Sequence, residues 1–270
     1  MKIQGAKILI TGGGSGIGLA LAQVLAAGGA SLALVGRNRE KLEHACSVLA
    51  KQGGRATPLV FDLAQPSGHA QLIADAKQVL GGLDILVNNA GVADFCEFAA
   101  QTPEAIGTAV SANLAAPLLL TRAALPDMLR ARRGQIVNMG SGFGSIGFPH
   151  FAVYSATKFG IRGFSEALRR ELADSGVAIT YVAPRGTLTD LNSPAWMRVA
   201  KQTKIAMDAP EAVAAFIAQA IERDAKEAKF GVPEKFFAKL NGLLPRLLDQ
   251  ALAGQTRIAR AVLQEKPPGT

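Results

Sequence analysis

The stretch that decides the fold runs from residue 7 to residue 18 and reads KILITGGGSGIG. A short, mostly apolar run opens it, and a glycine-rich turn follows at once. An Ala/Leu-rich segment, residues 19–27, comes next, and a second apolar run covers residues 31–35. Strand, glycine-rich turn and helix in this order predict the opening βαβ unit of a dinucleotide-binding fold. The glycines let the backbone approach a pyrophosphate, and the helix N-terminus offers free N–H groups.

The rest of the chain continues this alternation of short apolar runs and helical stretches. We expect strands at residues 7–11, 31–36, 56–61, 85–88, 135–139 and 178–183, and helices at 16–27, 40–52, 68–80, 103–132 and 154–174. Such alternation produces βαβ crossovers and a parallel sheet covered on both faces. Thr102 and Pro103 provide an N-cap and a proline at the first helical position, and Pro117 is expected to bend or divide that long helix. With neither an internal repeat nor a low-complexity linker, we predict a single α/β domain.

Composition limits the class of protein. The chain has 270 residues, of which 49% are hydrophobic, and this suits a globular protein with a sizeable core. We find no window of about eighteen apolar residues and no signal-peptide pattern, so we expect no transmembrane span and a cytoplasmic location. Cys46 and Cys96 are too few for a disulfide framework and are expected to be buried, reduced thiols. The three histidines are widely scattered, so we predict no metal site.

The formal charge of +8 could indicate nucleic acid, an anionic ligand or a membrane surface. The basic residues are dispersed and form no stripe interleaved with aromatic residues, so nucleic-acid binding is not expected. A phosphorylated cofactor and the C-terminal segment can account for part of the excess.

The end of the second strand bears on the kind of cofactor. NAD-selective proteins of this architecture hold the ribose 2′-hydroxyl with an acidic side chain near this point. Here Gly36 takes that place and Arg37 follows it. A guanidinium can bind a 2′-phosphate through two hydrogen bonds. Arg37 and Arg39 could instead be solvated turn residues, but the pattern favours NADP(H).

Two further segments follow predicted strands at their carboxyl ends, where open α/β sheets bind ligands. Asp62 and Leu63 follow the third strand, and the sequence NNAG, residues 88–91, follows the fourth. The latter could be a simple loop. Together with the glycine-rich turn it predicts a second wall of a cofactor crevice.

The segment richest in chemistry is residues 141–158. Ser141 follows the fifth strand, and Tyr154 and Lys158 are four residues apart, on one face of the predicted helix. An ammonium group near a phenol favours the phenolate and lowers its pKa, which makes the tyrosine a usable proton donor and acceptor. Ser141 could polarise a substrate carbonyl if the loop 142–153 folds back. A Tyr-x-x-x-Lys pair alone is more often an exposed helix face.

Taken together, these motifs resemble the short-chain dehydrogenase/reductases over roughly residues 5 to 225. The resemblance implies a Rossmann-type, doubly wound parallel sheet of about seven strands and an NADP(H)-dependent oxidoreductase. It implies that Tyr154 is the general acid/base, that Ser141 orients the carbonyl, that Lys158 binds the nicotinamide ribose and lowers the tyrosine pKa, and that Asn113 holds a water in a proton relay. The implied cofactor contacts are Gly12, Gly14, Ser15, Gly16, Ile17, Gly18, Arg37, Asp62, Leu63, Asn89, Ala90, Gly91, Tyr154, Lys158, Thr187 and Thr189.

One position departs from the family pattern. After the sixth strand the family usually has Pro-Gly, whereas this chain has Pro184 followed by Arg185. We expect cofactor binding to be preserved, with altered contacts at Thr187 beside the carboxamide.

Residues 189–210 form an irregular segment that the family uses as a lid over the substrate. Trp196, the only tryptophan, lies there and could contact substrate or simply pack the lid. Phe148 and His150 precede Tyr154 closely, although His150 could equally be an exposed loop residue. We include Ser141, Phe148, His150 and Trp196 as candidate substrate contacts, and the aromatic residues favour an apolar substrate.

The C-terminal part extends beyond the common core. We divide the chain into a catalytic domain, residues 1–229, an amphipathic helical extension, 230–263, and a disordered tail, 264–270. Apolar residues of the extension, from Phe236 and Phe237 to Leu252, recur at helical spacing, and Pro245 is expected to start its second helix. The apolar stripe could cover the substrate pocket, pack on a partner subunit, lie at a membrane surface, or belong to the core.

We therefore predict a reductase, or the reverse dehydrogenase, that moves hydride between nicotinamide and a carbonyl or secondary alcohol, with a hydrophobic ketone or 3-oxoacyl chain as substrate. Two alternatives remain: a dinucleotide-sensing protein without turnover, and a membrane-peripheral reductase of lipid ketones. By resemblance we expect a homodimer or homotetramer, formed through the helices at 112–132 and 154–174.

Overall fold

A computed structural model of the protein describes residues 1–231 and 240–265. In this part of the chain seven parallel strands form one sheet in the order β3-β2-β1-β4-β5-β6-β7. The strands are β1 (Lys7–Thr11), β2 (Ser31–Gly36), β3 (Arg55–Val60), β4 (Ile85–Asn88), β5 (Gly134–Met139), β6 (Val177–Ala183) and β7 (Glu227–Lys229). Because the strand order reverses between β1 and β4, a crevice opens there at the carboxyl edge. The predicted Rossmann-type fold is confirmed.

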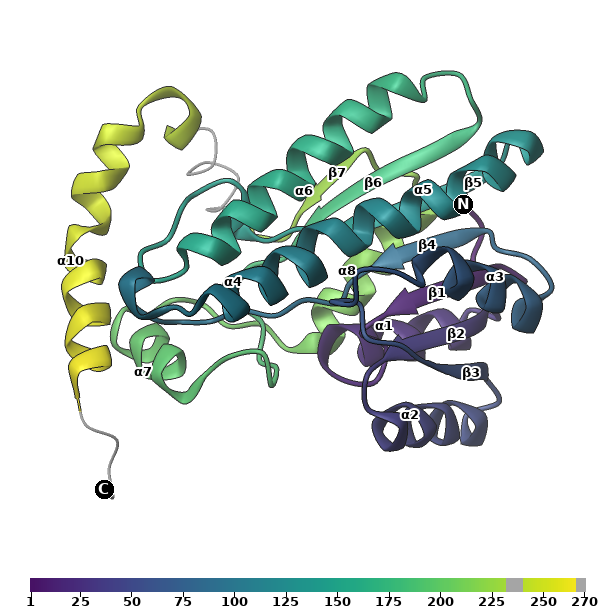
Figure 1. Ribbon diagram of the computed structural model, residues 1–270, viewed down its shortest axis with the longest axis horizontal. Coiled ribbons are helices and arrows are strands. Elements are labelled where there is room, and N and C mark those ends of the chain that lie inside the picture. The colour runs from purple at the N-terminus through teal and green to yellow at the C-terminus, as the bar shows by residue number, and fades with distance from the viewer. Residues whose placement is uncertain (232–239, 266–270) are drawn as a thin grey trace.

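Helices cover both faces of the sheet (Figure 1). They are α1 (Gly16–Ala27), α2 (Arg39–Lys51), α3 (His69–Leu80), α4 (Pro103–Val110), α5 (Ala116–Ala131), α6 (Ala152–Glu171), α7 (Pro194–Gln202), α8 (Pro210–Glu222) and α10 (Pro245–Gln264). Alternate residues of each strand point to opposite faces and so divide the core in two. Ile8 and Ile10 join α1 and α8 in one cluster, whereas Leu9 joins α3 and α5 in the other.

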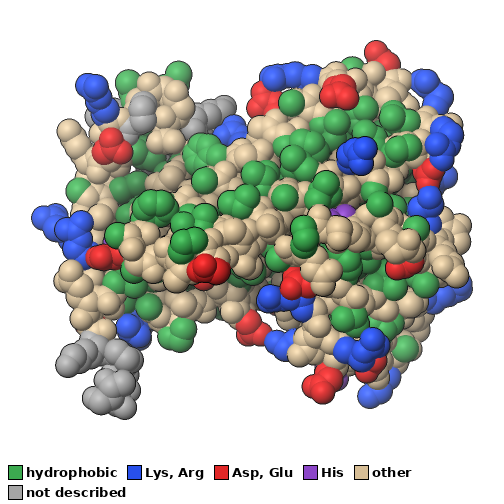
Figure 2. All heavy atoms as spheres, viewed as in Figure 1, with side chains coloured by type: hydrophobic (Ala, Val, Ile, Leu, Met, Phe, Trp, Pro, Cys, Tyr) green, Lys and Arg blue, Asp and Glu red, His purple; other side chains and the backbone are tan. Residues whose placement is uncertain are grey.

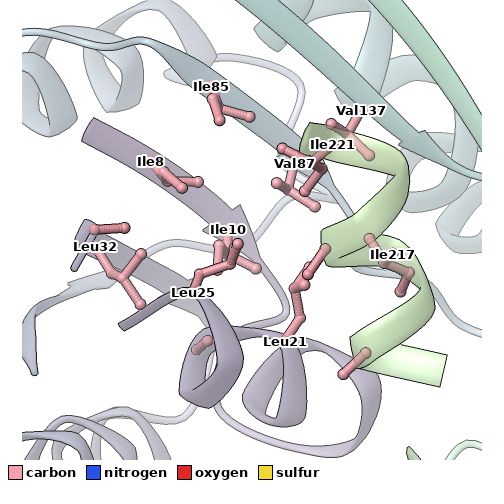
Figure 3. Packing of buried hydrophobic residues seen from close by; sticks show 14 of the residues in the cluster. Ile8, Ile10, Leu21, Leu25, Leu32, Ile85, Val87, Val137, Ile217 and Ile221 are labelled. Atoms are coloured by element: carbon pink, nitrogen blue, oxygen red, sulfur yellow. The ribbon is translucent and has the colours of Figure 1, made fainter. Parts of the chain in front are cut away.

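The first of these clusters is shown in Figure 3, where Leu21 and Leu25 of α1 and Ile217 and Ile221 of α8 converge on the sheet. All four side chains are buried. Burying an aliphatic side chain of this size contributes roughly 1.5–3 kcal/mol. The α1–α8 layer therefore fixes the helix whose N-terminus carries the glycine-rich turn.

Most predicted elements have the observed bounds to within a few residues. The third strand starts and ends one residue earlier than predicted, and α6 runs from Ala152 to Glu171 rather than over 154–174. Beyond α6 the chain turns through Asp174 and Gly176, both with positive φ. The sequence pattern did not predict β7, because three residues with a charged first position carry no apolar periodicity.

The long helix predicted over residues 103–132 is divided before Pro117 rather than at it. A short π-helix, Ser111–Ala115, separates α4 from α5, and Pro117 lies in the first turn of α5, where a missing N–H costs nothing. Thr102 caps α4 as predicted, accepting a bond from the amide of Ala105 (3.2 Å).

The run Pro103–Ala131 is long and apolar enough, by length and composition, to cross a membrane, unlike the prediction. Its buried side chains, among them Leu120 and Met128, belong to the core cluster beneath the sheet. Core helices of globular proteins pass the same test, so the run carries no argument for a membrane span.

The C-terminal segment is described from residue 240 to residue 265. Helix α10 begins at Pro245, as the sequence predicts, and packs against α7 at one end of the molecule (Figure 1). Asn241 ties the segment to the body by donating to the carbonyl oxygen of Ser145 (2.9 Å). The predicted apolar positions Phe236 and Phe237, and all but the first two residues of the predicted tail 264–270, lie outside the described residues.

Candidate active site

A cavity of about 1040 Å³ runs along the carboxyl ends of the strands, from the glycine-rich turn to α10. All sixteen residues predicted to contact the cofactor line it. These are Gly12, Gly14, Ser15, Gly16, Ile17, Gly18, Arg37, Asp62, Leu63, Asn89, Ala90, Gly91, Tyr154, Lys158, Thr187 and Thr189. The structure thus gathers into one crevice residues that are up to 177 positions apart, from Gly12 to Thr189.

The glycine-rich turn and the β4 turn are locked together. The hydroxyl of Thr11 accepts bonds from the amides of Asn89 (2.9 Å) and Ala90 (3.0 Å) and donates to the carbonyl of Val87 (3.2 Å). A Cβ on Gly18 would lie 2.1 Å from the carbonyl oxygen of Gly12, so the start of α1 passes too close to the turn for any side chain. The glycine-rich turn and the β4 turn, which the sequence predicts as two walls of the crevice, therefore form one connected surface.

Two basic side chains, Arg37 and Lys41, line the β2 end of the cavity together with Asn38 and Asp62. The ammonium of Lys41 also lies 3.8 Å from the carboxylate of Asp190. Asn38 caps α2 by accepting a bond from the amide of Lys41 (2.8 Å), which fixes the first turn of α2 at the cavity edge. Sequence reasoning missed Lys41, although a basic residue in the first turn after Arg37 is a signal that could have found it.

Ser141, Tyr154 and Lys158 meet near the middle of the cavity. Ser141 extends β5, and its side chain hydrogen-bonds that of Tyr154 on α6. Lys158, one turn further along α6, places Nζ 5.5 Å from the centre of the Tyr154 ring and donates to the carbonyl of Met139 (2.9 Å). The loop 142–153 does fold back, as the sequence argument required, because Phe143 at its start packs edge to face on the Tyr154 ring with the ring centres 6.3 Å apart.

The pKa values of these groups differ from the sequence-based expectation. Burial raises the pKa of Tyr154 above its usual range, and the hydrogen bond with Ser141 opposes that rise. Burial also lowers the pKa of Lys158 to about 8. Burial thus outweighs the lowering of the tyrosine pKa that the sequence argument expects from a nearby ammonium, because desolvation disfavours the charged form of both groups.

Asn113 lies behind the cavity wall rather than in it. Its side chain accepts from the amide of Val92 (2.8 Å), donates to the carbonyl of Val92 (2.8 Å), and donates to the hydroxyl of Thr157 (3.2 Å). A Cβ on Gly91 would lie 3.2 Å from its Oδ1 and 3.8 Å from Nζ of Lys158. Asn113 therefore adjoins the catalytic candidates, and its relay role remains a prediction.

Arg185 follows β6 and is held by residues on both sides of α8. Its guanidinium binds the carboxylate of Asp208 through two bonds (2.6 and 2.8 Å) and lies over the ring of Phe230. The segment beyond it pairs with residue 208, because the amide of Leu188 donates to the carbonyl of Asp208 (2.9 Å). The departure from the family pattern thus ties the chain after β6 to the chain before α8, and Thr187 still lines the cavity.

Aromatic rings enclose the other end of the cavity. Phe143 stacks on Phe148 with ring centres 4.9 Å apart, and Phe151 meets Trp196 edge to face at 5.1 Å. Trp196 is 96% buried, so it packs this segment onto the body, and it also lines the cavity. Its contact with substrate stays a prediction. Sequence reasoning missed the lining residues Phe95, Phe143, Ile205 and Gln255. Leu248, Ala251 and Leu252 of α10 belong to the predicted apolar stripe and line the cavity, which is one of the places that helical spacing left open for it.

Of the four candidate substrate contacts, Ser141, Phe148 and Trp196 line the cavity and His150 does not. His150 has a φ of 65°, and its ring packs edge to face on that of Phe95 with the ring centres 5.7 Å apart. Burial lowers its pKa. His150 is thus corrected from a substrate contact to a packing residue of the loop.

Among the described residues no group of three His, Cys, Asp or Glu side chains could hold a metal ion. Cys46 and Cys96 are both unpaired and half-buried.

Comparison with known proteins agrees with this geometry. The sequence profile of the family described as short chain dehydrogenase matches residues 6–199. The chain is 32% identical to the "Ketoacyl reductase HetN" of Nostoc sp., over 83% of this chain and 78% of the relative. It is 31% identical to "Dehydrogenase/reductase SDR family member 7B" of Bos taurus, over 96% of this chain and 83% of the relative.

Two solved structures are similar as well. A short-chain dehydrogenase from Sphingobium yanoikuyae in complex with NADPH superposes with a TM-score of 0.77 at 28% identity, covering 90% of this chain and 95% of the other. A metagenomic short-chain oxidoreductase in complex with NADP gives 0.72 at 29% identity, covering 86% and 98%.

Proposed function

The chain belongs to the short-chain dehydrogenase family, and from that premise we propose that it is an NADP(H)-dependent reductase of apolar ketones, or the reverse dehydrogenase. The family is one of oxidoreductases that act on small molecules. The observation that carries the proposal is the meeting of Ser141, Tyr154 and Lys158 at one point of the cavity, between its glycine-lined and aromatic-lined ends.

The three side chains divide the work on the reacting oxygen. Tyr154 has a raised pKa and is neutral near pH 7, so its hydroxyl can donate a proton to a carbonyl oxygen. Ser141, bonded to the same phenol, can donate a hydrogen bond to that oxygen and hold it in reach. Lys158 has a pKa of about 8, so near pH 7 most of it carries a charge that stabilises the phenolate left behind. A bound nicotinamide supplies the hydride, or takes it up in the reverse direction.

The residues present fit a dinucleotide. Ser15 precedes α1 and makes no side-chain capping bond, so the first amides of that helix face the cavity without a partner from Ser15. Gly12 and Gly16 have positive φ and allow the tight course of the glycine-rich turn before α1. Asn89, Ala90 and Gly91 would hold the middle of the cofactor, and Thr187 and Thr189 its nicotinamide end.

Arg37 and Lys41 support the choice of NADP(H) over NAD(H). Both line the β2 end of the cavity, and Gly36 offers no carboxylate to a ribose hydroxyl. A guanidinium and an ammonium that line the same end of a cavity suit a phosphomonoester, and the Lys41 ammonium lies 3.8 Å from the exposed carboxylate of Asp190. Similar proteins that bind NADP and NADPH point the same way.

An apolar substrate is supported by the aromatic end of the cavity, where Phe143, Phe148 and Trp196 lie within one cluster with Tyr154. The resemblance to a ketoacyl reductase adds a 3-oxoacyl chain to the candidates.

We further propose that the protein works in the cytoplasm as a homodimer or homotetramer. Exposed apolar side chains, among them Val110, Leu119 and Phe159, lie on α4, α5 and α6, and Figure 2 shows hydrophobic atoms spread across that face. Light scattering on the purified protein measures the mass, and a monomer would contradict this proposal.

A membrane-peripheral role receives less support. The apolar side of α10 is turned inward, with Leu248, Ala259 and Val262 buried, and so is not offered to lipid. Flotation with anionic liposomes tests the point, because a protein that floats with them would restore the membrane reading.

Oxidation of NADPH with a panel of ketones tests the main proposal. We expect turnover with apolar ketones, slower turnover with NADH, and oxidation of the matching secondary alcohols with NADP. Binding of NADPH without turnover on any ketone or alcohol would instead favour a dinucleotide-sensing protein.

A further inference from the structure

One side of α10 forms the end wall of the cavity. Its lining residues are Leu248, Ala251, Leu252 and Gln255, at intervals of three, one and three residues. Such spacing puts them on one face of the helix. This face is aliphatic apart from one amide and carries no charge, so it presents an apolar surface to whatever fills the space beyond Tyr154.

The second half of the same helix is anchored to α7. Ala259 and Val262 are buried in a cluster with Trp196 and Val199 of α7. Arg198 pairs with Glu265 (3.8 Å) just past the end of α10. The C-terminal half of α10 is therefore held against α7, while its N-terminal half lies across the end of the cavity. In Figure 1 it stands beside α7 at the end of the molecule, away from the glycine-rich turn.

The body of a substrate must therefore fit between Tyr154 and α10. Phe95, Phe143 and Phe148 wall this space from the loops, and they belong to the same cluster as Trp196 and Leu252. An aromatic wall and an aliphatic end wall reward apolar contact but offer no charged group to an ionic substituent. The position of Leu252 and Ala251 sets how far an apolar chain can reach.

Resting on the proposed function, we propose that α10 determines substrate size: Leu248, Ala251 and Leu252 limit the length of the apolar chain attached to the reacting carbonyl. A larger side chain on this face of α10 shortens the space between Tyr154 and α10, and a smaller side chain lengthens it. One methylene more or less in an apolar pocket changes selectivity about tenfold or more.

Ala251 and Ala253 provide a matched pair for the test. Both are exposed alanines on α10, but only Ala251 lines the cavity. The variants Ala251→Phe and Ala253→Phe are compared with the unaltered protein on straight-chain 2-ketones from butanone to dodecanone. We expect kcat/KM of Ala251→Phe to fall at least about tenfold for the longest ketones, with butanone unaffected and Ala253→Phe unchanged. Leu252→Ala should shift the optimum toward longer ketones.

Binding supplies a readout that does not depend on turnover. Trp196 is the only tryptophan and lines the cavity, so its fluorescence reports ketones that enter. Dodecanone should bind the unaltered protein and Ala253→Phe, and bind Ala251→Phe at least about tenfold more weakly. Identical size profiles or affinities in all variants, or no binding of any ketone, would overturn the role of α10. Ketone binding that follows the predicted order without any NADPH-dependent turnover would leave α10 as a binding element and sink only the proposed function.

Discussion

Lys158 holds its ammonium nitrogen 5.5 Å from the centre of the Tyr154 ring and bonds the carbonyl of Met139. Both side chains come from α6, one turn apart, and desolvation acts on each. It lowers the pKa of the lysine to about 8 and raises that of the tyrosine, so the lysine loses its proton first. Around neutral pH the pair is therefore a charged lysine beside a neutral phenol, which is the state that can donate a proton.

The lowered pKa of Lys158 predicts a rise in stability with pH. Between about 8 and the unfolded value of 10.5 the unfolded chain binds more protons at this residue, so a higher pH favours the folded state. From pH 7 to pH 9 the contribution to the free energy of unfolding should grow by about 1 kcal/mol. Urea unfolding at the two pH values measures it, with Lys158→Met as the reference in which this contribution is absent. An equal increase in the free energy of unfolding in both proteins would contradict a lowered pKa of Lys158 in the folded state.

Cofactor preference should depend on Arg37 and not on Arg39. Arg37 lines the cavity, whereas Arg39 lies outside it and pairs with Glu43 (3.5 Å). A charged hydrogen bond is worth about 1.5–3 kcal/mol, so Arg37→Ala should weaken NADPH binding by roughly ten- to a hundredfold and leave NADH binding almost unchanged. Calorimetric titration of both cofactors checks this, with Arg39→Ala as control. Equal losses for NADPH and NADH would assign Arg37 a structural role.

The ion pair of Arg185 with Asp208 should stabilise the chain beside the nicotinamide end. Both partners are largely buried and joined by two bonds. Asp208→Asn should lower the free energy of unfolding by about 1–3 kcal/mol, because it replaces two charge-assisted bonds to the guanidinium by weaker ones to a neutral amide. Glu166→Gln, in the exposed pair of Glu166 with Arg170, should change it by less than about 1 kcal/mol. Denaturant unfolding compares the two, and similar effects would count against a specific role of the buried pair.

Gly140 should tolerate no side chain. A Cβ there would lie 2.2 Å from the Tyr181 ring, whereas a Cβ on Gly142 would meet no atom within 4 Å. Overpacking of this kind costs about 1–3 kcal/mol, so Gly140→Ala should unfold at clearly lower urea concentration than Gly142→Ala. Comparable midpoints would show that Tyr181 moves aside freely.

Periodicity predicted the sheet well because its central strands are buried on both faces and read as unbroken apolar runs. The π-helix at Ser111–Ala115 and the short strand β7 escaped it. The π-helix depends on how α4 and α5 pack around Asn113. Strand β7 depends on its pairing with β6. Neither packing nor pairing leaves a periodic trace in the sequence.

The site was predictable where one turn supplies several residues, as at Gly12–Gly18. The motif residues Ser141, Tyr154 and Lys158 were predictable too, although they lie far from that turn in the sequence. Lys41 was missed, because it reaches the cavity only through the capping of α2 by Asn38. The place of Leu252 stayed open, because it depends on the docking of α10 on α7. His150 does not line the cavity, and its left-handed backbone angle is one that no spacing rule gives for a histidine.

The most direct measurement of the central claim separates binding from turnover in Tyr154→Phe. The phenyl ring keeps the packing against Phe143 and Phe151 and removes the proton donor. NADPH should bind with an unchanged dissociation constant, while turnover of a ketone that the unaltered protein reduces should fall by about a hundredfold or more. Ketone reduction that persists in Tyr154→Phe at the original rate would contradict Tyr154 as the proton donor.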